Sequence, residues 1–331
     1  MSETRLVRGG AVALPRLGAG GGSVFCAVPG AEADALARHV FDSGICYFDT
    51  APFYGQGLSE HRFGHTLREL PRASFVLSSK AGRLLKRDAE AAGPGKLPFQ
   101  VVYDYSYDGV MRSLEDSWQR LGLDRIDIVY IHDCSPHWRG DRYEDDFRDA
   151  VEGGYRALDE LRSSGVIGAI GVGIKDWDVC LRFSRAVDLD VVMLAGGYTL
   201  LEHESLRELL PECVQRGTAV AIASPFNSGI LAVGSEKAST YFYRPPPDSI
   251  VDRVKRLEAV CARYNVPLGA AAIQFPFSHP AVSTIVAGYA RKEEVDTNLA
   301  WANMPIPADL WHELVAEGLL PEMMQIPGGV S

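Results

Sequence analysis

The sequence alternates short apolar runs with longer amphipathic segments, and this alternation constrains the fold more than any other feature. Most of the short runs are nearly continuous in apolar and β-branched residues, which is typical of strands buried on both faces of a parallel sheet. Eight such strands are predicted, at Arg16–Ala19, Ile45–Asp49, Phe75–Ser79, Asp127–Ile131, Ala169–Gly173, Asp190–Leu194, Ala219–Ala223 and Ser283–Val286.

The segments between these strands have apolar residues spaced three and four apart, as in helices that cover a sheet. Helices are predicted at Glu32–Ser43, Val110–Arg120, Glu152–Ser163, Glu204–Arg216, Ile250–Tyr264 and Pro307–Glu317. Glycines suited to left-handed C-caps follow four of them, at Gly44, Gly122, Gly165 and Gly217. Strand–helix alternation with about eight strands predicts a single (β/α)8 TIM barrel domain over residues 1–331.

Some segments interrupt this rhythm. Arg87–Asp108 and Asp133–Asp149 exceed the usual connection length, and Pro245–Pro247 marks a third irregular stretch. Long connections in a barrel are usually substrate loops on its C-terminal face, so we expect loops there. The tail, Pro321–Ser331, is rich in proline and glycine and is expected to be irregular.

The main alternative fold is a dinucleotide-binding Rossmann domain. Gly18–Gly22 superficially resembles its glycine fingerprint, and Asp49 ends the next strand. The sixth position of the pattern is Ser23 rather than glycine, and Ser23–Gly30 contains Pro29, so no helix is expected to begin at the last glycine. The glycines are better explained by a turn that passes close to a ligand or a neighbouring segment.

Charge and composition exclude several classes of partner. With 33 basic and 43 acidic residues the net charge is −10, which disfavours nucleic acid and, less strongly, an anionic membrane surface. No apolar run reaches the ~20 residues of a membrane span, and the first residues lack a signal-peptide stretch. We therefore expect a cytoplasmic protein that acts on a small molecule; the sequence does not indicate its oligomeric state.

The six cysteines do not indicate a metal site, because no two form a C-x-x-C pair. Most are expected to be reduced, buried and small hydrophobic residues. Cys134 lies two residues after His132, and packing is favoured over catalysis as its role.

Four polar residues lie at or just after the ends of predicted strands, where barrel enzymes carry catalytic groups. Asp49 ends the second strand, and Tyr54 follows five residues later. Lys80 follows the third strand and His132 the fourth. A buried lysine needs a partner, and Asp49 on a neighbouring strand ~5 Å away is the obvious one.

These four side chains have the chemistry of a proton relay. An ammonium group ~4 Å from a tyrosine contributes roughly 4 kcal/mol at an effective dielectric of ~20, which would bring its pKa from about 10 to about 7. A general acid/base works best when its pKa is close to the operating pH. His132 would donate a hydrogen bond that orients a substrate oxygen. With no nucleophile and no metal ligand set, the residues suit carbonyl/alcohol redox with a hydride-carrying cofactor.

These residues and their surroundings resemble the aldo-keto reductase superfamily over nearly the whole chain. The segments that carry the resemblance are Phe48–Gly55, Ser59–Glu60, Asp124–His132, Gly165–Gly173 and Ala223–Leu231. The resemblance implies a (β/α)8 barrel and a nicotinamide cofactor extended across its C-terminal face. It implies that Asp49, Tyr54, Lys80 and His132 are the catalytic tetrad.

The resemblance also implies a set of cofactor-binding residues. Tyr198 would stack on the nicotinamide, and Ser224, Gly229 and Leu231 would line the pyrophosphate. The segment from Gly288 to Glu294 would surround the adenosine ribose, and Asn298 would lie near the adenine. Two positions of the cofactor site depart from the family pattern.

Two positions differ where the family holds the carboxamide. Gly173-Ile174-Lys175 replaces a Ser-Asn pair after the fifth strand, and Ala195 replaces a glutamine. Carboxamide recognition must therefore be partly different.

The choice between NAD and NADP depends on charge near the ribose. Glu294 stands where NADP-preferring relatives often carry arginine, and a carboxylate satisfies a free 2′-hydroxyl, so NAD is favoured. Arg291–Lys292 keeps NADP open, because a 2′-phosphate binds cationic side chains. The acidic residues also fit the exposed first turn of a helix, where the dipole favours them.

Within the superfamily, Val102–Ser106 and Ala195–Leu201 resemble a subgroup of sugar and pyridoxal dehydrogenases. This resemblance implies oxidation of a cyclic hemiacetal: an aldose such as L-fucose or a D-threo-aldose at C1 to the lactone, or alternatively pyridoxal to 4-pyridoxolactone. Candidate pocket residues are Phe25, Phe53, His137, Trp138 and, where packing is an equally good explanation, Trp301. A non-catalytic barrel that binds nicotinamide and a protein partner is a further alternative.

Overall fold

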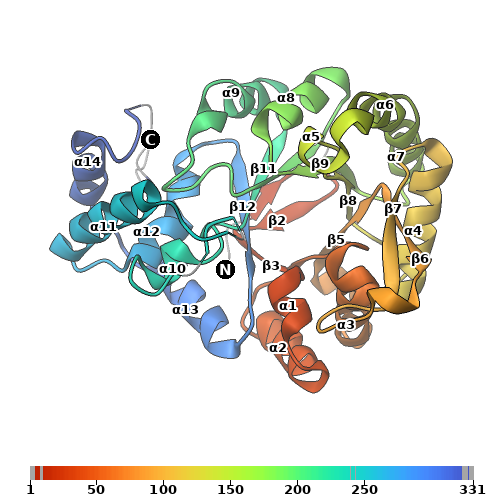
Figure 1. The fold of residues 1–331 in the computed structure, drawn as a ribbon, viewed down its shortest axis with the longest axis horizontal. Helices are drawn as coiled ribbons and strands as arrows, with labels where there is room; N and C mark the ends of the chain where they lie inside the picture. The colour runs from red at the N-terminus through yellow and green to blue at the C-terminus, as the bar shows by residue number, and fades with distance from the viewer. Residues whose placement is uncertain (1–3, 8–9, 239, 243, 323–326, 328–331) are drawn as a thin grey trace.

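Eight parallel strands close into a barrel (Figure 1). The computed structural model describes residues 4–7, 10–238, 240–242, 244–322 and 327. The barrel strands are β3 (Leu17–Gly20), β4 (Tyr47–Asp49), β5 (Val76–Ala81), β8 (Ile128–His132), β9 (Ala169–Ile174), β10 (Val191–Ala195), β11 (Ala219–Ala223) and β12 (Val282–Gly288). Each overlaps a predicted strand, and β12 pairs with β3 to close the ring. The predicted (β/α)8 barrel is confirmed, and closure excludes the open sheet of a Rossmann domain.

Helices surround the strands (Figure 1). They are α1 (Ser23–Ala27), α2 (Gly30–Asp42), α3 (Leu58–Leu67), α4 (Tyr107–Leu121), α5 (Pro136–Arg139), α6 (Tyr143–Asp149), α7 (Tyr155–Ser163), α8 (Trp177–Ala186), α9 (Leu209–Arg216), α10 (Ile230–Val233), α11 (Asp248–Arg263), α12 (Leu268–Gln274), α13 (Lys292–Asn303) and α14 (Ala308–Ala316). All six predicted helices are present with shifted ends. Four further helices, α3, α8, α12 and α13, also surround the barrel, and these were not predicted.

The predicted boundaries shift where the helix type changes. The segment predicted as one helix from Glu152 begins with a π-turn, Ala150–Gly154, before α7. The segment predicted from Glu204 begins with the 3₁₀ turn Glu204–Leu206 before α9. The glycines predicted as C-caps adopt positive φ, at Gly44, Gly122, Gly165 and Gly217.

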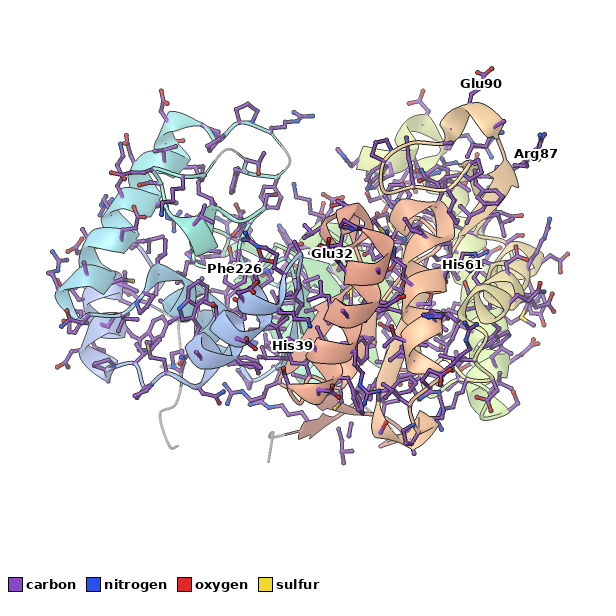
Figure 2. The ribbon with its side chains drawn as sticks, turned by 90° about the horizontal axis from the view of Figure 1, so that it is seen from below. Glu32, His39, His61, Arg87, Glu90 and Phe226 are labelled. Carbon is purple, nitrogen blue, oxygen red and sulfur yellow. The ribbon has the colours of Figure 1, made fainter. Side chains whose placement is uncertain are left out.

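The two long segments expected to be loops contain regular structure. Within Arg87–Asp108, strand β7 (Phe99–Tyr103) pairs antiparallel with β6 (Arg83–Arg87). Arg87 and Glu90 lie at the outer end of this hairpin (Figure 2). Asp133–Asp149 is mostly helical, because Tyr143 and Phe147 are four residues apart and both pack into the core.

The remaining irregular stretches lie at two other places. Pro245–Pro247 leads into α11, with Pro247 at its N-cap. Of the tail, residues 323–326 and 328–331 lie outside the described part of the chain.

A hairpin that was not predicted, β1 (Thr4–Leu6) with β2 (Ala13–Pro15), packs against the inside of the barrel. Leu14 and Val12 join the buried cluster of the barrel interior, with Tyr47, Tyr130 and Met193. A Cβ on Gly168, just before β9, would lie 2.7 Å from Val12 Cγ2, so hairpin and barrel are in tight contact. In the described part of the chain, no helix is long and apolar enough to cross a membrane.

The glycine-rich segment after β3 behaves as a close turn, with one difference from expectation. A short helix, α1, does begin at Ser23, and Val28 and Pro29 in extended backbone end it after five residues. A Cβ on Gly21 would lie 2.2 Å from Ser59 Oγ and 2.6 Å from Phe63 Cε2, whereas one on Gly22 would contact nothing within 4 Å. The glycine at position 21 therefore allows α3 to approach the mouth of the barrel.

This difference between adjacent glycines predicts unequal effects of alanine. Gly21→Ala should lower the free energy of unfolding by about 1–3 kcal/mol, because the added methyl group overpacks the contact with α3. Gly22→Ala, with open space around it, is the matched control and should stay within about 0.5 kcal/mol of the wild type. Urea unfolding measures both, and equal effects would contradict the explanation.

Candidate active site

The four predicted catalytic residues converge at the C-terminal end of the barrel. Asp49 ends β4, Lys80 is the penultimate residue of β5, and His132 ends β8. These three strands are consecutive neighbours, with β4 paired to β5 and β5 to β8. Tyr54 begins the short 3₁₀ segment Tyr54–Gly57 that follows β4. Neighbouring strands thus place residues that are more than eighty positions apart in one site.

Lys80 is buried and its three N–H donors all have partners. Its Nζ donates to both carboxylate oxygens of Asp49, at 2.6 and 2.8 Å, and to the carbonyl oxygen of Thr50 at 2.9 Å. Ser78 Oγ donates to the same carboxylate at 2.7 Å. Burial lowers the pKa of Lys80, and the charge of Asp49 opposes that shift. The ammonium lies 4.6 Å from the centroid of the Tyr54 ring.

His132 is a buried, neutral imidazole. Burial lowers its pKa well below 6.5, and the nearby cations Arg83 and Lys80 add to the shift. Its ring lies 5.7 Å from the ring of Tyr54, at an interplanar angle of 89°. Its Nδ1 is buried and has no hydrogen-bond partner. A neutral imidazole can donate from one ring nitrogen only, which suits the orienting of one substrate oxygen.

Two charged residues beside the tetrad were not predicted. Arg83 Nη2 donates to Asp133 Oδ2 at 2.7 Å, and the same oxygen lies 3.3 Å from His132 Nε2. Burial raises the pKa of Asp133, and the charges of Arg83 and Lys80 oppose this. The strand-end rule that identified His132 could have found Asp133, which follows it directly. Arg83 carries no such signal, because only the β6–β7 hairpin brings it to the site.

Three of the predicted pocket residues lie beside the tetrad. The ring of Phe53 lies 6.1 Å from that of His132 and 5.7 Å from that of Trp138, and His137 lies 5.3 Å from Trp138. Trp138 is 40% exposed. These aromatic side chains form one wall next to the predicted catalytic groups.

Phe25 and Trp301 are placed elsewhere. Phe25 is 3% exposed and stacks on Phe63 at 4.5 Å, so it packs α1 against α3 and does not contribute to that wall. Trp301 packs on Gly269, where an added Cβ would lie 2.2 Å from its ring, and on Phe226, which Figure 2 shows near the middle of the molecule. Both positions are explained by core packing, because an aromatic side chain fills space as well in a core as in a pocket.

The predicted cofactor residues divide into two groups. At the barrel mouth, Gly288 pairs with Gly20, Ser224 is exposed with φ 54°, and Gly229 has φ 100°. Glu294 and Asn298 lie one turn apart on α13. Glu294 accepts from the backbone N–H of Ala290 at 2.8 Å and pairs with Arg291 at 2.9 Å, so it stabilises the start of its own helix.

The second group, Tyr198 and Leu231, is buried. Tyr198 has no exposed surface, shares a hydrogen bond with Ser278 at 2.9 Å and packs against Phe275. Leu231 is fully buried, and its N–H donates to the carbonyl oxygen of Phe226. Both side chains are buried in the structure, and their assignment to the cofactor site stays a prediction.

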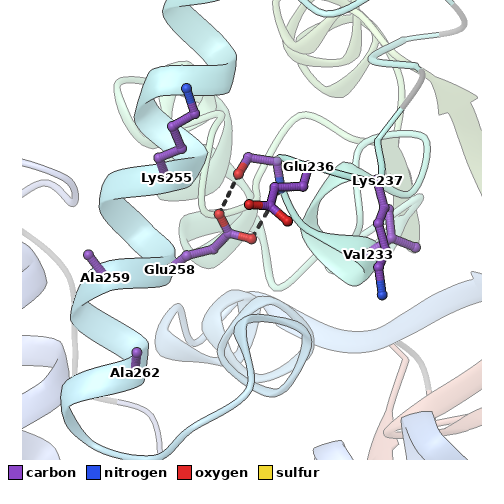
Figure 3. Close-up of a pocket in the computed structure, with 8 residues that line it drawn as sticks. Val233, Glu236, Lys237, Lys255, Glu258, Ala259 and Ala262 are labelled. Carbon is purple, nitrogen blue, oxygen red and sulfur yellow. Dashed lines mark hydrogen bonds between the residues drawn. The ribbon is translucent and has the colours of Figure 1, made fainter.

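Other candidate features have structural explanations. Burial raises the pKa of the Cys134 thiol, which is fully buried, as expected for a packing role. A surface hollow of about 510 Å³ lies between α10 and α11, where Ser235 donates to Glu258 (Figure 3). Its lining includes both the acidic Glu236 and the basic Lys255, so it favours neither an anionic nor a cationic ligand. None of the four predicted catalytic residues is among the residues that line it.

Comparison with known proteins agrees with this geometry. The model of the Aldo/keto reductase family matches residues 16–316. The chain belongs to the aldo/keto reductase family. It is 42% identical to a pyridoxal 4-dehydrogenase of Microbacterium luteolum over 90% of this chain and 92% of that one. It is 41% identical to a D-threo-aldose 1-dehydrogenase of a Pseudomonas species over 94% and 96%.

The fold comparison is equally extensive. The holo form of an aldo-keto reductase from Bacillus halodurans superposes with a TM-score of 0.76 at 21% identity, covering 98% of both chains. This aldo/keto reductase is therefore an oxidoreductase, which disfavours the non-catalytic barrel, and enzymes of this family use NAD(P).

The buried Lys80–Asp49 ion pair predicts a large loss of stability when Lys80 alone is replaced. Most of that loss should be recovered when Asp49 is replaced as well. Lys80→Met should lower the free energy of unfolding by about 3–5 kcal/mol, because it leaves Asp49 charged, buried and unpaired. Adding Asp49→Leu removes that charge and should recover most of the loss. Denaturant unfolding of both variants measures this, and additive losses in the double variant would contradict it.

The lowered pKa of His132 predicts a pH-dependent contribution to stability. The unfolded chain takes up this proton at about pH 6.5, whereas the folded protein does so only at much lower pH. Stability from His132 is therefore complete above pH 6.5 and falls as the pH drops, by about 1.4 kcal/mol per pH unit.

The comparison of two histidine variants isolates this contribution. His132→Gln should lose less stability than the wild type between about pH 6.5 and pH 5. His312→Gln, on the exposed side of α14, is the control and should follow the wild type. Urea unfolding at both pH values gives the result; a drop in His132→Gln as large as in the wild type would refute the assignment.

Proposed function

We propose that this aldo/keto reductase oxidises a cyclic hemiacetal, an aldose such as L-fucose at C1, to the lactone. The observation that carries the proposal is the Asp49–Lys80 pair, which holds an ammonium 4.6 Å from the ring of Tyr54, beside a neutral His132. The relative that is a D-threo-aldose 1-dehydrogenase supports the substrate class.

The residues divide the reaction between them. His132 holds the hydroxyl oxygen of the hemiacetal, and Tyr54, as phenolate, takes its proton. Lys80 stabilises that phenolate, and Asp49 fixes Lys80. A nicotinamide, when bound, would supply the acceptor for the hydride on the same carbon, and oxidation of that carbon by two electrons would give the lactone carbonyl.

Residues at the barrel mouth fit such a cofactor. Asn227 follows β11, its Oδ1 is buried without a partner, and its Nδ2 donates to the carbonyl oxygen of Gly196 at 3.4 Å. Gly196 adjoins Ala195, where the family's glutamine is missing, so Asn227 would hold the carboxamide. Gly20 and Gly288 would let the cofactor approach the backbone closely.

We propose NAD as the preferred cofactor and NADP as the alternative. Arg291 is paired with Glu294, so that its guanidinium is already engaged and a carboxylate faces the same region. This favours a free 2′-hydroxyl over a 2′-phosphate.

Pyridoxal is the second candidate substrate, because the chain is 42% identical to a pyridoxal 4-dehydrogenase. Its cyclic form presents a hemiacetal carbon to the same four residues. A flatter and more apolar pocket would suit it, and the aromatic side chains of Phe53 and Trp138 are compatible with that.

The test is NADH formation by the purified protein with NAD and L-fucose or pyridoxal. Turnover with L-fucose is expected, and Tyr54→Phe should reduce it by roughly 10²–10⁴-fold while cofactor binding, followed by fluorescence, is unchanged. Tyr107→Phe, which removes only a surface hydrogen bond to Glu160, is the matched control.

Each other outcome has a distinct meaning. Turnover with pyridoxal alone would replace the sugar by the second candidate. Faster turnover with NADP would reverse the cofactor preference, and turnover that survives Tyr54→Phe would refute the mechanism.

A further inference from the structure

Arg83 and Asp133 form a charged pair next to the tetrad that the proposed reaction does not use. Arg83 is 1% exposed, and its carbon Cζ lies 4.3 Å from the ring centroid of Phe53 and 4.7 Å from that of Trp138. Its Nε and Nη1 are buried without partners. Burying a guanidinium is costly unless it is paired, and Asp133 supplies the pairing.

The backbone directs Asp133 towards the site. Asp133 has φ 44°, an unfavourable conformation for a residue with a side chain, and its N–H donates to the carbonyl oxygen of Gly173 at 3.0 Å. Such strain persists where the surrounding structure imposes it, and it is concentrated at functional sites. Here it places Oδ2 3.3 Å from His132 Nε2, on a side chain that remains 17% exposed.

Two hydrogen-bonding groups for a substrate are therefore adjacent. His132 holds the reacting oxygen, and the Asp133 carboxylate lies directly beside it. In a substrate with oxygens on two adjacent carbons, these two oxygens also lie close together. When the oxygen on the reacting carbon is bound at His132, the oxygen on the next carbon therefore lies near Asp133. An ionised carboxylate only accepts hydrogen bonds, so it selects a neighbour that donates, a neutral hydroxyl.

We propose that Asp133, held in place by Arg83, binds the hydroxyl on the carbon next to the reacting carbon and thereby selects vicinal hydroxy-hemiacetals, the aldoses. This inference rests on the proposed function and refines it. In pyridoxal the carbon next to the reacting carbon carries no oxygen. Its phenolic oxygen lies one carbon further away, and in its anionic form the carboxylate repels it. The aromatic wall of Phe53 and Trp138 suits the apolar face of a sugar ring.

The experiment compares L-fucose with 2-deoxy-L-fucose, which lacks only that hydroxyl. The wild type should prefer L-fucose by roughly tenfold to hundredfold in kcat/KM, the effect of one hydrogen bond to a charged group. Asp133→Ala should bring this ratio close to one, mainly by slowing L-fucose. Asp133→Asn, which keeps the shape but loses the charge, should give an intermediate ratio.

One control variant and the use of a ratio keep the result specific. Asp178→Asn removes the same charge from an exposed position at the start of α8 and should leave the ratio unchanged. Because each ratio is measured on one preparation, it does not depend on how much of a destabilised variant is folded.

The outcomes separate the two proposals. Equal kcat/KM for both sugars in the wild type, or a ratio that Asp133→Ala leaves intact, would overturn the role of Asp133 while the hemiacetal oxidation stands. A wild type that oxidises neither sugar and does oxidise pyridoxal would overturn the aldose function and this inference together.

Discussion

The buried ion pair between Lys80 and Asp49 is the interaction on which the site depends. Two charges are removed from water here, and only full hydrogen bonding makes that tolerable. Asp49 accepts from Lys80 and from Ser78, and Lys80 also reaches a backbone carbonyl. The result is a fixed positive charge beside Tyr54, in surroundings that strengthen its effect.

The barrel makes this pair possible, because neighbouring strands hold the two residues in register. Hydrogen bonds continue from the site into the barrel interior, where Ser78 and Tyr130 each contact the hydroxyl of Tyr47, at 3.0 and 3.1 Å. Catalytic and structural groups thus form one network on three strands, β4, β5 and β8. A change in the barrel interior is therefore expected to reach the catalytic groups.

The tetrad could be predicted because its signal is local: each residue lies at or near the end of an apolar run. Residues assigned by their place in a pattern lack such a signal. Phe25, Tyr198 and Leu231 are all buried, and burial follows from how neighbouring helices and strands pack, which a sequence pattern does not give. The β6–β7 hairpin was missed because its strands, unlike those of the barrel, are only half-buried.

The sequence by itself determined the strand–helix alternation, hence the barrel, and the residue types at the strand ends, from which we propose proton transfer coupled to hydride transfer. Only the tertiary structure decided which side chains meet at the candidate site. Arg83 reaches the site through a hairpin, and Asp133 through a left-handed backbone turn that composition does not reveal. The spacing of apolar residues indicates which side of one helix or strand is buried. A binding site is made by contacts between different helices and strands, and those contacts form only when the barrel closes.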